Sequence, residues 1–369
     1  MKEKDIISVL IPDGENPLLF NVLNCLSLAD EVEVYVMSSS QNSPYKFSRF
    51  VKKFSHHPIP KNDLEWIENI NNELHKYNVD KVLPIFEKGL EILIRHRDLI
   101  PKEKLVELPS MQSFKTALNK GLLMRFMDEN KIQTSNSIVV KPGERFVSNG
   151  KIKYPVLAKP TLDSGGGEGI EKLYNEEEVE AFFKKNKFYK DYLVEEFIEG
   201  YDLCCNVLCN DGEILAHTIH KGLMKGQKVF GPSVGLEFLY NDDVLELTAH
   251  LMKALKWNGV ANLDLRYDQV SKRFKIIEIN PRFWYNVDAS AVFGVNFPHL
   301  YLMSSLGYCI EFGSYETKKY LNINGIMKRV KSNPFSLFNL KSTFKNSQLR
   351  FALRDPLPLL SRIFAKSKT

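Results

Sequence analysis

The chain has 369 residues, of which 44% are hydrophobic and 26% charged, and its formal net charge is +5. This length accommodates two or three domains, and this composition is typical of an ordinary soluble protein rather than a disordered one. No apolar run approaches the ~18 residues that a membrane-spanning helix needs, and no signal-peptide pattern opens the chain. The five cysteines are odd in number and show no C-x-x-C spacing, so we interpret them as reduced thiols of a cytoplasmic protein.

The first 110 residues alternate strand-like and helix-like segments. Strands are predicted at residues 6–11, 31–38, 81–86 and 105–108, and helices at residues 16–29, 62–77 and 89–98. This alternation indicates a parallel α/β sheet, and the first turn lacks the G-x-G-x-x-G of a dinucleotide site. Glu87 follows a strand end, where such sheets place ligands, although a carboxylate facing a helix dipole is an equally good interpretation.

A second domain is predicted to follow. An amphipathic helix at residues 113–130 contains Asn119 and Lys120, and a later apolar strand carries Lys159 just before a glycine-rich loop at residues 164–169. Glycines let backbone N–H groups close on phosphate oxygens without Cβ clashes, but a flexible turn is the alternative. The loop is not a Walker loop, because no G-x-x-x-x-G-K-[ST] occurs in the chain.

Short strands dominate from residue 192 to residue 284. Strands at 192–200, 201–209 and 214–220 surround the hairpin turn at residues 210–213, and a helix at 242–256 precedes the strands at 260–267 and 273–280. The last two strands are expected to pair antiparallel, which would direct Asp264 and Glu278 into one cleft.

Oxygen-bearing side chains gather in the last of these strands. Glu278 and Asn280 share one strand face because they are two residues apart, and Arg282 follows directly after Pro281, which ends the strand. Carboxylate and amide oxygens suit Mg²⁺, and arginine binds phosphate bidentately. An edge strand with one polar face is the alternative interpretation of this stretch taken alone.

Residues 115–307 resemble the ATP-grasp superfamily, because six motifs follow one another in the order typical of that family. The stretch Ile277–Arg282 is close to the version in the carbamoyl-phosphate-synthase branch. The resemblance implies an ATP-grasp fold, of mixed α/β and α+β class, with an N-terminal Rossmann-like α/β domain. We expect that domain at residues 1–112, an ATP-grasp domain at 113–312 with a lid at about 150–200, and a C-terminal extension at 313–369.

The resemblance also implies a set of nucleotide-binding residues. The triphosphate would be held by Lys120, Lys159, Ser164, Gly165, Gly166, Gly167 and Gly169. Adenine and ribose would contact Glu195, Glu196, Phe197, Ile198 and Asp202. Two Mg²⁺ ions, with Mn²⁺ as an alternative, would bind Asp264, Glu278 and Asn280.

The resemblance implies fewer residues for the second half of the reaction. Arg282 would contact the transferring phosphate, together with Lys159. His220 and Lys221, close to a predicted acceptor loop at 221–237, are candidates for contact with the acyl phosphate or the substrate. Solvated strand-end residues are the alternative for this pair. Arg266 is a candidate for the substrate carboxylate, with a salt bridge as its alternative role.

The implied activity is that of a cytoplasmic, ATP-dependent ligase that activates a small carboxylate as an acyl phosphate and joins it to an amine. Phosphorylation of a carboxylate or carbamate without an amine acceptor is one alternative. A non-catalytic ATP-binding module that acts through the C-terminal tail is another, although such a module has no need of both metal-binding acids.

The C-terminal tail concentrates the positive charge. Residues 328–369 contain ten lysines or arginines and one acid, Asp355, with aromatic residues interspersed. The tail therefore packs its aromatic side chains on the body of the protein, lies peripherally on an anionic membrane, or contacts an acidic carrier protein. Nucleic acid is the least favoured partner, and an oligomer is compatible with the sequence.

Overall fold

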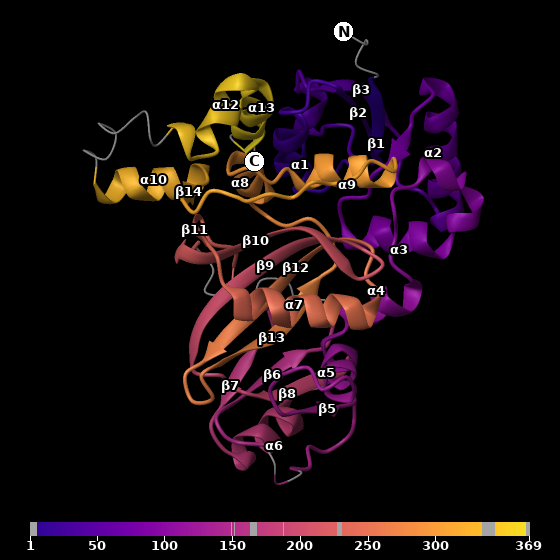
Figure 1. Ribbon diagram of the computed structural model, residues 1–369. Coiled ribbons are helices and arrows are strands. Elements are labelled where there is room, and N and C mark those ends of the chain that lie inside the picture. The colour runs from indigo at the N-terminus through magenta and orange to yellow at the C-terminus, as the bar shows by residue number, and fades with distance from the viewer. Residues whose placement is uncertain are drawn as a thin grey trace.

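The structure is a computed structural model that describes residues 6–148, 150, 152–162, 168–186, 188–226, 231–333 and 344–366. Within these residues the strands form a four-stranded parallel sheet, a six-stranded antiparallel sheet and a four-stranded antiparallel sheet. In Figure 1 the parallel sheet lies at the top, the six-stranded sheet in the middle and the small antiparallel sheet at the bottom.

The parallel sheet belongs to the N-terminal part of the chain, and its strand order is β3-β2-β1-β4. Its elements are β1 (Ile7–Ile11), α1 (Leu19–Leu26), β2 (Val32–Ser38), η1 (Pro44–Phe47), β3 (Val51–His56), α2 (Asp63–Tyr77), β4 (Lys81–Val82) and α3 (Glu87–Arg95). Gly14 follows β1 where β2 comes very close, since a Cβ on Gly14 would stand 2.3 Å from Val36 Cγ1. The loops after β1 and β2 therefore lie side by side at the carboxyl edge of the sheet.

Three strands of this sheet differ from the prediction, and the one predicted at residues 105–108 is reduced to a single bridge between Leu105 and Val82. The strand predicted at residues 81–86 pairs only over β4, because Pro84 has no backbone N–H with which to continue the ladder. The edge strand β3 is not predicted, because the consecutive Lys52 and Lys53 interrupt the alternation of polar and apolar residues.

The six-stranded sheet has the order β13-β12-β9-β10-β11-β14. Its strands are β9 (Gly200–Asn210), β10 (Glu213–Met224), β11 (Gly235–Leu239), β12 (Gly259–Asp268), β13 (Arg273–Asn280) and β14 (Lys319–Leu321). Its helices are α4 (Met111–Leu118), α7 (Asp242–Leu255), α8 (Val287–Val292) and α9 (Phe297–Ser305). The predicted hairpin is confirmed: Asp211 and Gly212 both have positive φ, as a tight two-residue turn between β9 and β10 requires.

The small sheet has the order β5-β8-β6-β7 and includes the region expected to form the lid. Its elements are α5 (Lys120–Glu129), β5 (Ser137–Val140), β6 (Val156–Pro160), β7 (Glu171–Leu173), α6 (Glu176–Lys185) and β8 (Tyr192–Glu196). The helix predicted at 113–130 is two helices, because Asn119 has an extended backbone and its side chain caps α5 by accepting from the N–H of Leu122.

One apolar core joins the parallel sheet to a face of the six-stranded sheet. It includes Val9 and Leu10 of β1 together with Phe238 of β11 and Phe283, all nearly or fully buried. These two sheets therefore pack as one body rather than as separately packed units.

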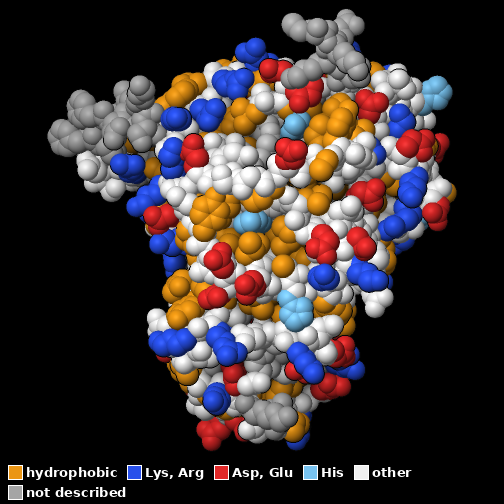
Figure 2. All heavy atoms as spheres, viewed as in Figure 1, with side chains coloured by type: hydrophobic (Ala, Val, Ile, Leu, Met, Phe, Trp, Pro, Cys, Tyr) orange, Lys and Arg blue, Asp and Glu red, His pale blue; other side chains and the backbone are white. Residues whose placement is uncertain are grey.

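The C-terminal segment packs against this body through β14, α10 (Ile323–Ser332), α12 (Leu349–Arg354) and α13 (Pro356–Lys366). Phe351 is 2% exposed, and Asp355 accepts hydrogen bonds from the Ser48 hydroxyl and the N–H of Arg49. Lys and Arg side chains gather over this part of the molecule in Figure 2. Of the helices that the structure describes, none combines the length and the apolar composition needed to cross a bilayer.

Candidate active site

Two carboxylates face each other where β12 pairs with β13. Asp264 lies opposite Glu278 in this antiparallel pair, as predicted from the spacing of the two strands. Burial and, to a lesser extent, the neighbouring Glu278 carboxylate together raise the pKa of Asp264 to about 7. The thiol of Cys204, on β9, donates to Asp264 Oδ1 at 3.0 Å. A cation bound beside Asp264 would therefore favour its ionised form.

Glu278 has such cations close by. Lys120 Nζ, at the start of α5, lies 3.1 Å from Glu278 Oε2. Burial acts to raise the pKa of Glu278, but the charges of Lys120 and Lys159 outweigh it and hold that pKa below its usual value. Of the two acids, Glu278 is thus the ionised one, and Asp264 is the one that takes up a proton.

Lys159, on β6, joins the acid pair to the predicted hinge. Its Nζ lies 2.6 Å from Glu195 Oε1 on the neighbouring β8, and both side chains are 3% exposed. A buried ion pair fixes the position of both groups, since either one alone would be an uncompensated charge. Lys159 is therefore fixed against Glu195, close enough to Glu278 for its charge to lower the pKa of that acid.

Arg282 connects this cluster to the N-terminal part of the chain. Its Nε donates to Glu87 Oε1 at 2.9 Å, and its Nη2 donates to Asn280 Oδ1 at 3.0 Å. The guanidinium also lies over the Phe86 ring, 5.6 Å from its centroid. Glu87, the first residue of α3, thus places the end of the parallel sheet beside the acid pair.

A row of amides leads from Asn280 into the six-stranded sheet. Asn280 Nδ2 donates to Asn262 Oδ1 at 3.1 Å, and Asn262 Nδ2 donates to Asn206 Oδ1 at 2.9 Å. Asn206 Nδ2 reaches Thr218 Oγ1 at 3.0 Å and His220 Nδ1 at 3.1 Å. Except for His220, these residues lie in one register across β13, β12, β9 and β10. The chain of bonds turns the Asn280 oxygen away from Asn262 and toward Arg282.

The site suits a hard divalent cation. Mg²⁺ is usually held by one or two carboxylates, with waters and substrate phosphates completing its shell. Asp264, Glu278 and Asn280 supply two carboxylates and an amide oxygen, and a cation among them would favour the ionised form of Asp264, whose pKa is otherwise raised. Within the described residues no group of three or more His, Cys, Asp and Glu side chains is placed to hold a metal, so the remaining ligands would come from the substrate and from water.

The predicted hinge residues lie at the end of β8 and the start of β9. Glu196 Oε1 accepts from Asn136 Nδ2 and from the N–H of Lys153, both at 2.9 Å. The Phe197 ring lies 3.6 Å from Lys172 Nζ, while Ile198 is 5% exposed. Their contact with adenine stays a prediction.

Arg266 is engaged with this hinge in the structure. Its Nη1 lies 2.5 Å from Asp202 Oδ1, and its Nε donates to the Ile198 carbonyl at 2.6 Å. The geometry thus displays the salt bridge that was the alternative role of Arg266. Asp202 itself remains open to solvent, with a side chain that is 70% exposed.

The predicted phosphate loop is described only in part. Ser164, Gly165, Gly166 and Gly167 lie outside the described residues. Gly169 has a φ of +75°, and a Cβ there would stand 3.1 Å from the Pro160 ring. Both observations explain a glycine at position 169.

His220 and Lys221 are inside β10 rather than at a strand end. His220 is 6% exposed, and burial lowers its pKa to about 4, so the ring is neutral near pH 7. Lys221 Nζ lies 2.9 Å from Glu237 Oε2 on β11. The solvated strand-end interpretation is therefore wrong for His220, and a role in catalysis stays a prediction for both.

Sequence reasoning missed Cys204, Asn206 and Asn262. The available signal was their spacing, because Asn262 is two residues from Asp264 and Cys204 two from Asn206, each pair on one strand face. All five cysteines are free.

Comparisons with known proteins agree with this geometry. Residues 188–328 match the model of a family described as ATP-grasp in the biosynthetic pathway with Ter operon. The carbamoyl phosphate synthase large chain of Methanobrevibacter smithii is 26% identical over 234 residues, which cover 58% of this chain. The match covers 22% of that protein, so the chain spans about a fifth of its length.

Solved structures resemble the chain over most of its length. An ADP complex of N5-carboxyaminoimidazole ribonucleotide synthetase has a TM-score of 0.66 at 14% identity, covering 89% of this chain and 85% of that one. The L-amino acid ligase of Bacillus licheniformis has a TM-score of 0.59 at 17% identity, covering 83% and 75%. At these identities the likeness establishes the fold, which is the ATP-grasp fold expected from the motifs.

Proposed function

We propose that this chain, which has the ATP-grasp fold and belongs to the ATP-grasp superfamily, is a ligase that uses ATP to join a small carboxylate to an amine. The carboxylate oxygen attacks the γ-phosphorus of ATP, which gives an acyl phosphate and releases ADP. The amine nitrogen then attacks the acyl carbon, phosphate leaves, and the nitrogen loses a proton.

The observation that carries this proposal is the half-buried acid pair Asp264–Glu278, with two lysines close to it and an arginine bonded to the neighbouring Asn280. Lys120 and Lys159 approach from the small sheet, and Arg282 approaches from the end of β13. Phosphoryl transfer depends mainly on positioning and on neutralising charge, and needs no nucleophilic side chain. This set of groups supplies both requirements.

Each group has a distinct task in the proposal. Asp264, Glu278 and Asn280 would hold Mg²⁺, which when bound neutralises charge on the phosphates. Lys120 and Lys159 would orient the triphosphate, and their present partners, Glu278 and Glu195, keep them aimed into the cleft. Arg282 would bind the transferring phosphoryl group. Because Glu87 already neutralises part of that guanidinium, phosphate would compete with Glu87 for it.

The test is the variant Glu278→Gln, which keeps the shape of the side chain and removes its charge. With Mg²⁺, ATP, a panel of carboxylates and a panel of amines, we expect wild-type protein to release ADP and phosphate only when a carboxylate is present, and product only with the amine. We expect Glu278→Gln to lower turnover by about 100-fold or more. Glu246→Gln, an exposed position on α7, is the matched control and should keep full activity.

Equal ADP release by wild-type protein and Glu278→Gln would refute the proposal. Metal-dependent ATP binding without turnover under any substrate pair would instead favour the binding-module interpretation.

A further inference from the structure

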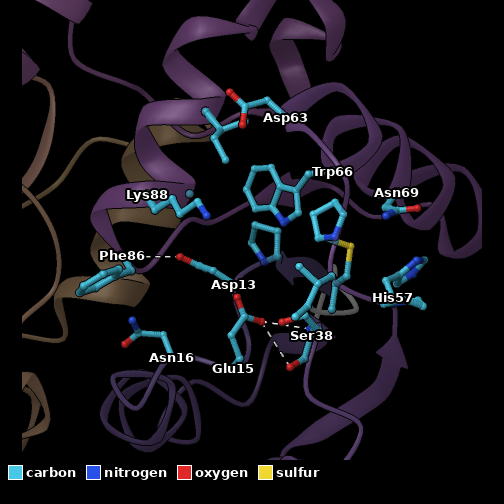
Figure 3. Close-up of a pocket in the computed structure, with 18 of the residues that line it drawn as sticks. Asp13, Glu15, Asn16, Ser38, His57, Asp63, Trp66, Asn69, Phe86 and Lys88 are labelled. Carbon is cyan, nitrogen blue, oxygen red and sulfur yellow. Dashed lines mark hydrogen bonds between the residues drawn. The ribbon is translucent and has the colours of Figure 1, made fainter.

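The parallel sheet carries a cavity of about 350 Å³ that the nucleotide site does not use. It lies at the carboxyl ends of β1 and β2, between the loop of residues 57–62 and the first turns of α2 and α3 (Figure 3). Open α/β sheets bind ligands at this edge, and ligand pockets start at about 300 Å³. The cavity therefore has the place and the size of a small-molecule site.

One wall of the cavity is apolar. Trp66, Met37 and Ile92 line it, and Ile59, which is 81% exposed, extends it to the rim. The wall approaches α3 closely because residue 89 is glycine: a Cβ there would stand 3.4 Å from the Trp66 ring and 2.9 Å from Asp13 Oδ2. This wall suits the apolar body of a ligand.

Two carboxylates also line the cavity, Asp13 and Glu15, which Figure 3 labels. Asp13 is 6% exposed and accepts backbone N–H bonds from Ile85 and Phe86. Glu15 Oε2 accepts from the N–H of Ser39 at 3.1 Å. Neither acid has an ion pair within the part of the chain that the structure describes. Burial raises the pKa of Asp13 to about 7, and an ammonium group beside Asp13 would favour its ionised form. Carboxylates at this place repel phosphates and attract an ammonium group.

The remaining charged or titratable residues that line the cavity are Asp63, His57, Lys88 and the exposed Lys61. Asp63 is paired with Arg95 at 2.7 Å, and His57 with Glu73 at 2.9 Å. Lys88, by contrast, has no hydrogen bond or ion pair to any described residue, and its ammonium is directed to the same space as Trp66 in Figure 3. The cavity thus offers an acidic side, a basic side chain and an apolar wall together.

The cavity shares a wall with the proposed reaction site. Phe86 lines the cavity and also lies against the Arg282 guanidinium, and the next residue, Glu87, accepts from Arg282 Nε. A molecule held against Phe86 would sit next to the group proposed to bind the transferring phosphate.

We propose that this cavity binds the amine substrate, and that this substrate is an α-amino acid with an apolar side chain. Its ammonium group contacts Glu15 and Asp13, its carboxylate contacts Lys88, and its side chain packs on Trp66. That the bound molecule is the amine substrate rests on the proposed ligase function.

The experiment is calorimetric titration of the full-length protein with L-phenylalanine and two truncated probes. Phenethylamine lacks the carboxylate, and 3-phenylpropanoate lacks the amine. We expect saturable binding of L-phenylalanine, with each truncated probe about tenfold weaker or more, because each loses one charged contact. Glu15→Gln should weaken L-phenylalanine and phenethylamine but leave 3-phenylpropanoate unchanged. Lys88→Met should weaken L-phenylalanine and 3-phenylpropanoate but leave phenethylamine unchanged.

Glu68→Gln and Lys53→Met, exposed positions outside the cavity, are the matched controls and should bind as wild type does. No saturable binding of L-phenylalanine or of L-leucine to wild-type protein would overturn the inference, as would the same loss of affinity in the control variants as in the cavity variants. Ile59 lies at the exposed rim, so Ile59→Glu should not affect folding. This variant should bind L-phenylalanine and 3-phenylpropanoate more weakly, because the new carboxylate repels theirs. Unchanged affinity of Ile59→Glu for these two probes would also count against the inference.

The two proposals fail in different ways. If L-phenylalanine binds with the predicted variant pattern but never supports product formation, the cavity assignment stands and the ligase proposal fails. If amino acids support product formation with the same KM in Glu15→Gln and Lys88→Met as in wild type, the ligase proposal stands and the cavity assignment fails.

Discussion

His220 shows how a buried side chain can have a fixed charge state. The ring contacts Asn206 Nδ2 through its Nδ1 and lies 5.5 Å from the Phe238 ring, in surroundings that burial makes unfavourable for an imidazolium. With a pKa of about 4, the neutral ring accepts the Asn206 hydrogen bond at every pH where the enzyme would work.

This charge state predicts a pH-dependent stability. The pKa of His220 is about 4 in the folded protein and near 6.5 when unfolded, so between these values the unfolded chain binds more protons. The contribution of the neutral His220 ring to the free energy of unfolding is therefore fully present above about pH 6.5. It decreases as the pH falls toward 4. We expect acidification from pH 7 to pH 5 to lower the free energy of unfolding by about 2 kcal/mol more in wild-type protein than in His220→Asn.

Urea denaturation of both proteins at pH 7 and pH 5 measures this difference, and the variant controls for every other titrating group. Parallel losses of stability in the two proteins would contradict the burial of a neutral ring.

The residues of the acid pair were predictable, while their partners were not. Asp264 and Glu278 follow from strand periodicity and a short turn, which are local properties. The pairing of Lys159 with Glu195 and that of Arg282 with Glu87 depend on how separate sheets pack, and one-dimensional spacing carries no such information. The same limit explains why Asn262 and Asn206 escaped notice: an asparagine in a strand is unremarkable until its neighbours on the next strands are known.

At the scale of elements, the row of amides ties four strands of the six-stranded sheet to the orientation of one proposed ligand. Asn280 must present its oxygen to a metal, and its nitrogen is already occupied by Asn262. Groups that orient metal ligands from behind commonly change metal affinity by 10–100-fold when removed.

The variant Asn262→Ala tests this orienting role. We expect it to weaken Mn²⁺ binding in the presence of ADP by about tenfold, because Asn280 is then free to turn its nitrogen toward the metal. Mn²⁺ affinity can be followed by electron paramagnetic resonance. Ser290→Ala, which removes a hydroxyl 3.2 Å from Thr218 at the far end of the same network, is the control. If the network has only a structural role, both variants should bind Mn²⁺ as tightly as wild type does. Their losses of stability should then be similar.

The ends of helices and strands matched the prediction where local residues determine them. They differed from it where pairing with a neighbouring strand determines them. The helix break at Asn119 is a local capping event that a run of helix-forming residues concealed. The edge strands β3 and β14 exist because a neighbouring strand offers free backbone groups, so tertiary context rather than propensity creates them.

At the scale of the whole molecule, one buried carboxylate joins three distant parts of the chain. Asp288, in α8, is fully buried and accepts amide N–H bonds from Asn21 at 3.1 Å and Asn24 at 2.8 Å, both in α1. Gln348, from the C-terminal segment, donates a third at 2.9 Å. Burial raises the pKa of Asp288, and the amides act against that rise. The tail is thus part of the folded body at this point, while its contact with a membrane or a carrier protein stays a prediction.

The C-terminal segment is therefore expected to contribute to global stability rather than behave as an appendage. Replacing Gln348 with Leu removes one donor from a buried carboxylate, and a lost hydrogen bond to a charged group costs about 1.5–3 kcal/mol. We expect Gln348→Leu to lower the free energy of unfolding of the whole protein by that amount, in one cooperative transition. Lys345→Ala, an exposed position in the same segment, should change it by less than about 0.5 kcal/mol. Equal effects of the two variants, or a separate early transition in Gln348→Leu, would mean that the tail unfolds independently of the sheets it covers.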